Sequence, residues 1–248
     1  MMRNRSVTPL TLALLALNHL AAQSPREANP ERPTYATHAY AVAPGYFEAE
    51  QGLSVRGVSS YAQGTSWDVA LKFGMTPNLQ AEVFGPFYAR GPGGGGVGDL
   101  GLALKVRGDL SPHVAIALVP AVTVPTGSAA RGLGAGRTLG AATAVFSADL
   151  PAAFHVDLNA GPAGVGAGTP QWFLSSSWSW SPGRIGLTAE CFAFTPGAAG
   201  PRFEGVLGAV TARLAPWVVL DLGGVRRIAT GSPNSLFLGL TTNLGRVF

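Results

Sequence analysis

Short runs of alternating polarity constrain the fold of this chain more than any other feature. From Trp67 to Gly74, every second residue is large and apolar, and the residues between them are charged or small. The stretches 99–107 and 185–191 repeat this pattern. Because successive side chains of a β-strand point to opposite faces, each run predicts a strand with one apolar face and one polar or small face. In a helix the same residues would be scattered around the axis.

The composition indicates which face of these strands is turned outward. Only 12% of the residues are charged, against roughly 25% in soluble globular domains, and 47% are hydrophobic. A soluble sandwich would fill its interior with large apolar residues and expose its charges. We therefore expect the reverse arrangement, in which apolar side chains face lipid while small and polar side chains line a lumen, as in outer-membrane β-barrels.

The N-terminus predicts export. Arg3 and Arg5 precede an apolar run from about residue 7 to 17, and the small pair Ala21-Ala22 follows. This order is typical of a signal peptide, here residues 1–22. An N-terminal membrane anchor is the alternative, but the run is shorter than the ~20 apolar residues that a spanning helix needs.

A proline-rich segment follows the predicted signal peptide. Residues 23–44 include Pro25, Pro30 and Pro33, and they predict an extended segment. We expect it to be periplasmic, and a position inside the barrel is the alternative that the sequence leaves open.

The barrel itself is assigned to residues 45–248. Linkers after even-numbered strands are short, whereas most linkers after odd-numbered strands are longer and richer in glycine. Short periplasmic turns and longer external loops are typical of bacterial outer-membrane barrels, which have even strand numbers. The prediction is therefore an all-β, antiparallel, up-and-down transmembrane barrel of about twelve strands, with ten and fourteen left open. The predicted strands are near 45–56, 66–74, 79–88, 98–107, 113–125, 138–148, 154–161, 171–180, 185–194, 203–213, 217–226 and 236–248.

Aromatic residues cluster near the ends of these strands. Trp67 and Trp172 fall at predicted external ends, and Trp180 and Trp217 fall near periplasmic ends. Since amphipathic rings favour the lipid–water boundary, they predict two aromatic girdles.

Several segments resemble one known family. The chain is similar to the outer-membrane transporter family named after the meta-pathway of phenol degradation, over residues 44–248. The resemblance implies a twelve-stranded barrel in the bacterial outer membrane that passes small, often hydrophobic or aromatic, compounds. It also fits a chain that ends in phenylalanine, and we expect Phe248 to be recognised by the barrel assembly machinery, although Arg246 departs from the usual apolar residue. The matching segments are 44–50, 73–80, 98–105, 122–127 and 220–223, together with Glu190.

Charged residues on the polar strand faces are the candidate functional residues. One interpretation is a ladder of salt bridges between neighbouring strands that braces the wall. The other is a constriction that selects solutes by charge. The predicted lumen-lining residues are Glu48, Glu50, Asp68, Lys72, Glu82, Lys105, Arg107, His155, Asp157, Glu190 and Asp221.

Other classes of function find weaker support. The glycines at 93, 95 and 98 match a dinucleotide-binding pattern, but an alternating strand follows them instead of a helix. No basic run exceeds Arg226-Arg227, so we expect no nucleic-acid binding. His38, His113 and His155 lack metal-ligand spacing, and no metal or cofactor is predicted.

The sequence as a whole predicts passive passage of small solutes through a barrel in contact with outer-membrane lipid. The alternative is a closed structural or binding barrel without transport. A hydrolase built from His155, Asp157 and the serines at 175, 177 and 179 is a third and less favoured reading.

Overall fold

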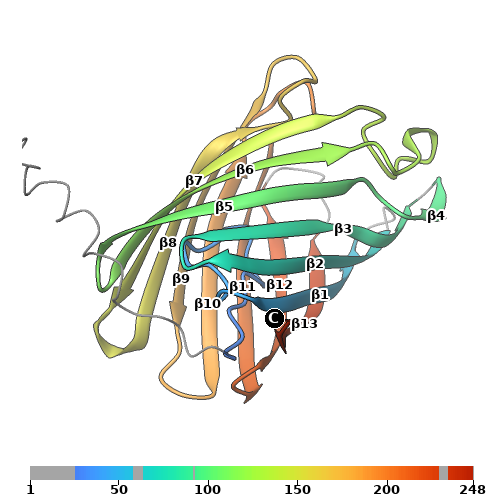
Figure 1. Cartoon of the computed structure of the whole chain (residues 1–248). Coiled ribbons are helices and arrows are strands. Elements are labelled where there is room, and N and C mark those ends of the chain that lie inside the picture. Colours follow the sequence, from blue (N-terminus) through green and yellow to red (C-terminus); the bar gives the residue numbers. More distant parts are fainter. Residues whose placement is uncertain (1–25, 58–63, 92, 229–233, 248) are drawn as a thin grey trace, which may run out of the picture.

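The computed structural model describes residues 26–57, 64–91, 93–228 and 234–247, and the regular secondary structure in these ranges is β-strand apart from two short 3₁₀ turns (Figure 1). The predicted signal peptide, residues 1–22, and Phe248 lie outside the described residues. No helix in the described ranges is long and apolar enough to span a bilayer. The strands are β1 Tyr46–Arg56, β2 Gly64–Thr76, β3 Leu79–Gly91, β4 Gly94–Gly96, β5 Leu100–Ser111, β6 Val114–Val124, β7 Leu139–Leu150, β8 Phe154–Ala163, β9 Gln171–Trp180, β10 Ile185–Phe194, β11 Phe203–Ala215, β12 Val218–Arg227 and β13 Ser235–Arg246.

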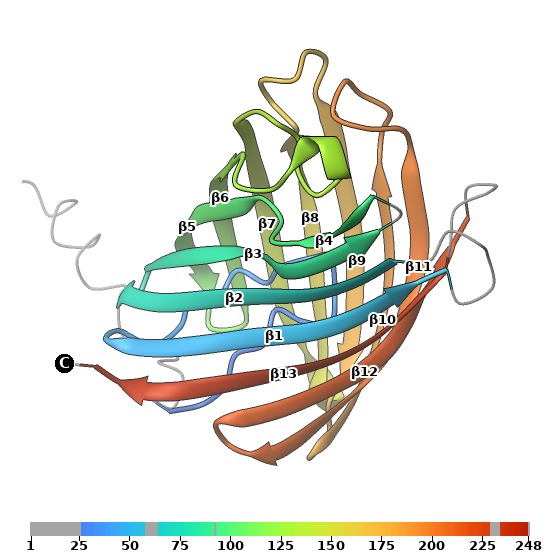
Figure 2. The ribbon, with the colours of Figure 1, turned by 90° about the vertical axis from the view of Figure 1, so that its right-hand side faces the viewer.

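Twelve of these strands form a closed antiparallel ring (Figures 1 and 2). Neighbours in the ring follow one another in the chain, and β1 pairs with β13 to close it, with Leu53 opposite Leu238. The prediction of twelve strands is confirmed. The additional strand, β4, is three residues long and pairs only with the end of β3. It escaped prediction because a run of glycines has no alternating pattern.

The two ends of the barrel differ in their connections. The turns between β2 and β3 and between β5 and β6 are short, whereas β6 and β7 are joined by residues 125–138, which include the 3₁₀ turn Ala129–Arg131. We call the end with the short turns the short-turn end, and the end with the longer connections the loop end. This is the predicted asymmetry between the two ends of the barrel.

The outer surface of the barrel is apolar. On β5, Leu102 and Leu104 are 52% and 45% exposed, whereas Lys105, which points the other way, is only 2% exposed. The same contrast recurs around the ring, so that large apolar residues are exposed and charged residues are enclosed. The predicted orientation of the two strand faces is confirmed.

Aromatic side chains lie on this outer surface near both ends. Trp172 at the loop end and Trp180 at the short-turn end are 52% and 40% exposed. Trp67 packs edge-on against Phe87 near the loop end, with 5.0 Å between the ring centroids. Indole and phenyl rings at such positions are typical of the interfacial girdles of membrane barrels.

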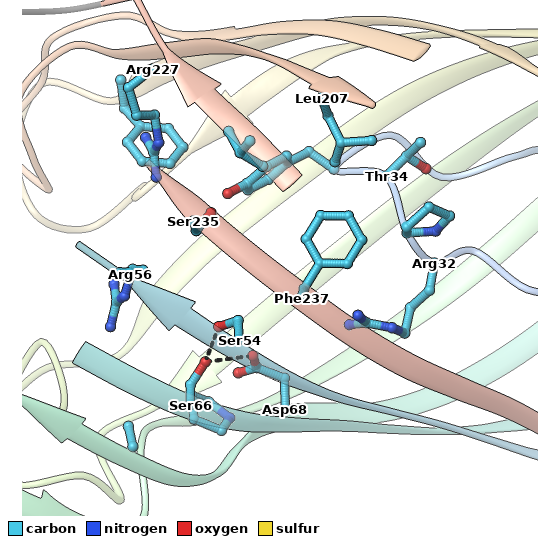
Figure 3. Close-up of a pocket in the computed structure, with 16 residues that line it drawn as sticks. Arg32, Thr34, Ser54, Arg56, Ser66, Asp68, Leu207, Arg227, Ser235 and Phe237 are labelled. Atoms are coloured by element: carbon cyan, nitrogen blue, oxygen red, sulfur yellow. Dashed lines mark hydrogen bonds between the residues drawn. The ribbon is translucent and has the colours of Figure 1, made fainter. Parts of the chain in front are cut away.

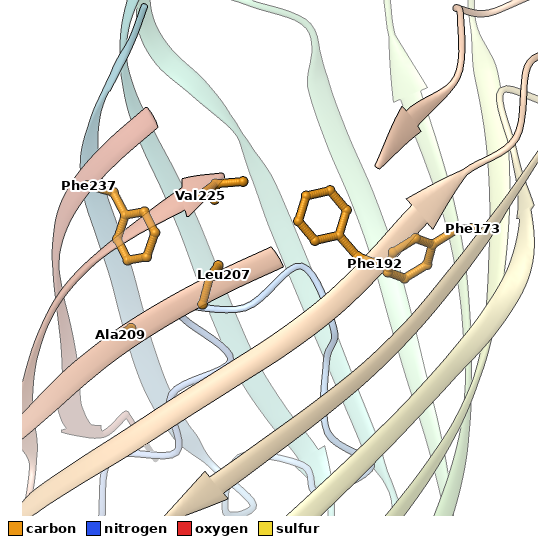
Figure 4. Packing of buried hydrophobic residues seen from close by; sticks show 6 residues of the cluster. All are labelled: Phe173, Phe192, Leu207, Ala209, Val225 and Phe237. Carbon is orange, nitrogen blue, oxygen red and sulfur yellow. The ribbon is translucent and has the colours of Figure 1, made fainter. Parts of the chain in front are cut away.

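The interior is not uniformly polar, contrary to the expectation of a lumen lined by small and polar residues. Phe173, Phe192 and Phe237 belong to a buried inward-facing cluster on β9–β13, completed by Leu207, Ala209 and Val225 (Figure 4). Phe173 shares a strand face with Ser175, and Phe192 shares one with Glu190. The period of two therefore places these rings on the inner face, together with polar residues of the same strands.

We predict that a charge placed on the outer surface destabilises the barrel according to its depth. Leu104→Arg near the middle of β5 should cost about 2–4 kcal/mol, and Leu110→Arg at the short-turn end about 0–1 kcal/mol. Urea titration of the protein in phospholipid vesicles measures both. Equal effects of the two substitutions would contradict a lipid-facing surface.

Candidate functional site

The N-terminal segment, residues 26–43, lies inside the ring of strands. It is the blue trace that runs within the barrel in Figures 1 and 2, and it has no regular secondary structure. Ala39 and Val42 are 0% and 1% exposed. Of the two locations that the sequence leaves open for residues 23–44, the described residues 26–43 therefore occupy the lumen.

Carboxylates on β1 hold the first part of this segment through its backbone. Glu48 accepts a hydrogen bond of 2.6 Å from the amide of Asn29. Glu50 accepts bonds of 2.6 and 3.2 Å from the amides of Glu31 and Arg32. An irregular backbone inside a protein needs partners for its N–H groups, and these inward carboxylates supply them.

The opposite wall holds the next part in the same way. Glu190 on β10 accepts hydrogen bonds of 2.8 Å from the amides of both Tyr35 and Ala36. Asn159 on β8 accepts a bond from the amide of Thr37 and donates one to its carbonyl, both at 2.9 Å. The segment is thus held from both sides of the lumen.

Two more side chains continue this arrangement toward β1. Ser147 on β7 accepts a hydrogen bond of 2.8 Å from the amide of Ala39 and donates one of 2.6 Å to Asp157. Gln80 on β3 accepts a bond of 2.9 Å from the amide of Val42. Ser147 and Gln80 were not singled out from the sequence, because neutral polar residues are ordinary on a lumenal strand face.

Two lysines and several carboxylates form a buried ionic cluster where the segment crosses β1, β2 and β5. The ammonium group of Lys72 lies 2.5 Å from Glu50, 2.9 Å from Glu48 and 3.5 Å from Glu31. The ammonium group of Lys105 lies 2.7 Å from Glu31. Glu31, which belongs to the segment, therefore joins two lysines of the wall.

Glu82 and Asp68 lie on neighbouring parts of the same wall. Glu82 on β3 stands directly opposite Lys72 in the strand register. Asp68 lies nearer the loop end and accepts a hydrogen bond of 2.7 Å from the hydroxyl of Ser66. Asp68 thus belongs to the upper part of the lumen, beyond the ionic cluster.

The electrostatics of the segment favour an ionised Glu31 and a neutral His38. Burial disfavours ionisation of Glu31, but the charges of Lys105 and Lys72 outweigh it and hold the pKa of Glu31 well below its ordinary value. Burial, together with Lys105, lowers the pKa of His38 to about 3. Because the pKa of Glu31 falls on docking, its contribution to docking is complete above about pH 4.3 and is lost as the pH falls through the lowered pKa.

Charged and aromatic contacts also hold two side chains of the segment against the wall. In the first half of the segment, Arg32 donates two hydrogen bonds of 3.3 Å to Asp221, the fourth residue of β12 counted from the short-turn end. Near the short-turn end, the guanidinium of Arg107 lies 4.7 Å from the centroid of the Tyr40 ring. Both contacts use wall residues that the sequence predicted as lumenal.

His155 takes part in a polar group rather than a catalytic arrangement with serine. Its Nδ1 lies 2.7 Å from Asp149 and its Nε2 lies 2.9 Å from Asp157. Both ring nitrogens therefore contact carboxylates, and Ser175 donates its hydroxyl proton to Glu190 instead. The Ser–His pairing that a hydrolase needs is not formed among these residues.

A cavity of about 410 Å³ lies beyond the segment toward the loop end (Figure 3). We call it the upper cavity. Residues 32–35 of the segment contribute one side of it, and its walls differ in character. Ser54, Arg56, Ser66 and Asp68 come from β1 and β2, whereas Phe203, Leu207, Val225, Arg227 and Phe237 come from β11–β13.

Comparison with known proteins defines the fold. The sequence matches no protein-family model and no curated protein. Among solved structures, the COG4313 outer membrane channel from Pseudomonas putida F1 superposes with a TM-score of 0.59 and 16% identity, over 90% of this chain and 100% of that one. The chain has the fold of an outer-membrane channel.

Two porins show the same likeness. The KdgM porin in complex with disordered oligogalacturonate gives a TM-score of 0.56 at 5% identity, over 79% of this chain and 98% of that one. The NanC porin gives 0.56 at 8% identity, over 80% and 100%. The resemblance to the phenol-degradation family stays a prediction.

We predict that the ionic cluster stabilises the barrel strongly. Lys72→Met leaves Glu48 and Glu50 buried beside each other without their cation, and breaking a buried ion pair in this way costs about 3–5 kcal/mol. Arg202→Met is the control, because the exposed pair of Arg202 and Glu204 should be worth at most about 1 kcal/mol. Urea titration in vesicles compares the two, and similar losses would contradict a stabilising cluster.

Proposed function

We propose that the protein is a bacterial outer-membrane channel for the passive passage of small solutes, through a lumen narrowed by residues 26–43. The observation that carries this proposal is the closed ring with an apolar outside and enclosed charges, together with an unfilled upper cavity. A barrel that served only as a membrane anchor would not need enclosed charges at such density.

The segment sets the size class of the solute. It occupies the short-turn half of the lumen, where the amide of Ala28 bonds to the carbonyl of Pro216 in a turn. The unfilled space above it, the upper cavity of about 410 Å³, has the size of a small-molecule pocket. The phenyl cluster of Phe173, Phe192 and Phe237, like the resemblance to the phenol-degradation family, supports hydrophobic or aromatic solutes.

A closed structural barrel is the second candidate. The favouring observation is that wall side chains, among them Glu48, Glu50 and Glu190, bond directly to the backbone of the segment. An enzyme is not favoured, because His155 and Ser175 are both engaged with carboxylates.

We further propose the assignments that accompany this function. Residues 1–22 act as a cleaved signal peptide, residues 45–248 form the membrane domain in contact with outer-membrane lipid, and Phe248 is recognised by the barrel assembly machinery. In this topology the loop end faces the cell exterior.

We predict that the purified protein conducts ions in planar bilayers and that loss of the segment increases conductance. A variant lacking residues 26–42 should conduct more than the full chain, because the segment no longer obstructs the short-turn half. Arg202→Met, on the loop side, serves as the control and should conduct like the unmodified protein. Absence of conductance from both the full chain and the deletion variant would favour the closed barrel.

A further inference from the structure

The upper cavity holds two arginines without carboxylate partners among the described residues. Arg32 is paired with Asp221 at 3.3 Å. Arg56 and Arg227 line the same cavity, and neither forms an ion pair in the part of the chain that the structure describes. Figure 3 shows these two arginines on the side of the cavity away from Arg32.

Aromatic rings hold the Arg227 guanidinium in place, but two of its nitrogen atoms lack hydrogen-bond partners among the described residues. Its carbon lies 3.0 Å from the centroid of the Phe203 ring and 5.9 Å from that of Phe192. Its Nε and Nη1 are buried and have no hydrogen-bond partner among the described residues. Ring faces attract the cation but accept no strong hydrogen bond, so buried N–H donors are left for another group. A guanidinium presents these donors as a planar fork that matches a carboxylate.

The polar side chains that the structure describes on the β1–β2 side of the cavity form no hydrogen bond to Arg227. The hydroxyls of Ser54 and Ser66 lie 2.8 Å apart, and Ser66 donates to Asp68 at 2.7 Å. These three side chains are thus linked to one another by hydrogen bonds, and none of these bonds reaches Arg227 (Figure 3). The Asp68 carboxylate would also repel an anion placed beside it, and so favour the side of the cavity with the arginines.

The facing wall is apolar and aromatic. Phe203, Leu207, Val225 and Phe237 line the cavity, and the ring of Tyr35 lies 4.2 Å from that of Phe192 and 5.8 Å from that of Phe203. A ligand that reaches Arg227 therefore meets rings along the rest of its length. A volume of about 410 Å³ falls in the lower part of the range of small-molecule pockets, roughly 300–1,000 Å³.

From this combination we propose that the upper cavity is a binding subsite for a small organic anion with one carboxylate and an apolar ring. The carboxylate accepts hydrogen bonds from Arg227 and is attracted by Arg56, while the ring packs against the phenylalanine wall. This inference rests on the proposed channel function in one respect, namely that it names the class of solute, and binding can be measured without transport.

The test uses the full-length protein in detergent and benzoate as the probe, with isothermal titration calorimetry. Benzoate should bind, whereas acetate, which lacks the ring, and benzyl alcohol, which lacks the charge, should bind about tenfold more weakly or worse. If benzyl alcohol binds as tightly as benzoate, the proposed role of the arginines is wrong. If acetate binds as tightly as benzoate, the proposed role of the aromatic rings is wrong.

Substitutions locate the subsite. Arg227→Gln should weaken benzoate binding about tenfold or more. Arg226→Gln is the matched control, because Arg226 is the adjacent residue, is exposed and points to the opposite face of β12, so binding should be unchanged. Arg56→Gln, at an exposed strand end, should weaken binding in the same direction and provides the test even if Arg227→Gln does not fold.

The binding measurement and the conductance measurement can each fail without the other. Benzoate binding by a protein that does not conduct would support the subsite while overturning the channel. Conductance without benzoate binding, or with equal binding by the unmodified protein and the folded arginine variants, would overturn the subsite and leave the channel in place.

Discussion

The structure depends on the pairing of backbone polar groups where bulk water cannot reach them. Within a bilayer, strands can satisfy their N–H and C=O groups only by closing into a ring, since an open edge would face hydrocarbon. The pairing of β1 with β13 removes that edge. Once the ring is closed, the outward side chains can be apolar without penalty, which explains how a chain with so few charges is stable.

The same requirement operates inside the ring. The segment of residues 26–43 forms no helix or strand, so its amides need acceptors from elsewhere. Glu48, Glu50 and Glu190 provide them, and Lys72 offsets the negative charge that the first two would otherwise bring together. The carboxylates that look like ion-selecting groups in the sequence thus hold a peptide.

The sequence supports a close prediction of the fold because alternation is a strong local signal. Strand ranges such as 171–180 and 185–194 agree with the structure, since each side chain on them reports its face. The site was less accessible to prediction. Placing Lys105 on the inner face follows from the period of two, but its contact with Glu31 joins residues 74 positions apart through a segment without any period.

The upper cavity shows the other limit of sequence reasoning. Arg227 and Phe203 lie on neighbouring strands near the loop end, and their stacking depends on the stagger between those strands. Hydrophobicity alone does not place these phenylalanines, because a phenyl ring can face either lipid or a partly apolar lumen. The alternation of side chains along β10 does place Phe192, since it lies two residues from Glu190 and so on the same face of the strand.

The position of the segment also has a consequence for biogenesis. Arg32 and Asp221 are 189 residues apart, and β1 must pair with the last strand of the chain. Contacts of such separation form slowly, because a long loop must be closed before they contribute. The segment inside the lumen therefore gains its last wall contacts late in folding, and filling of the lumen has to coincide with closure of the strands around it.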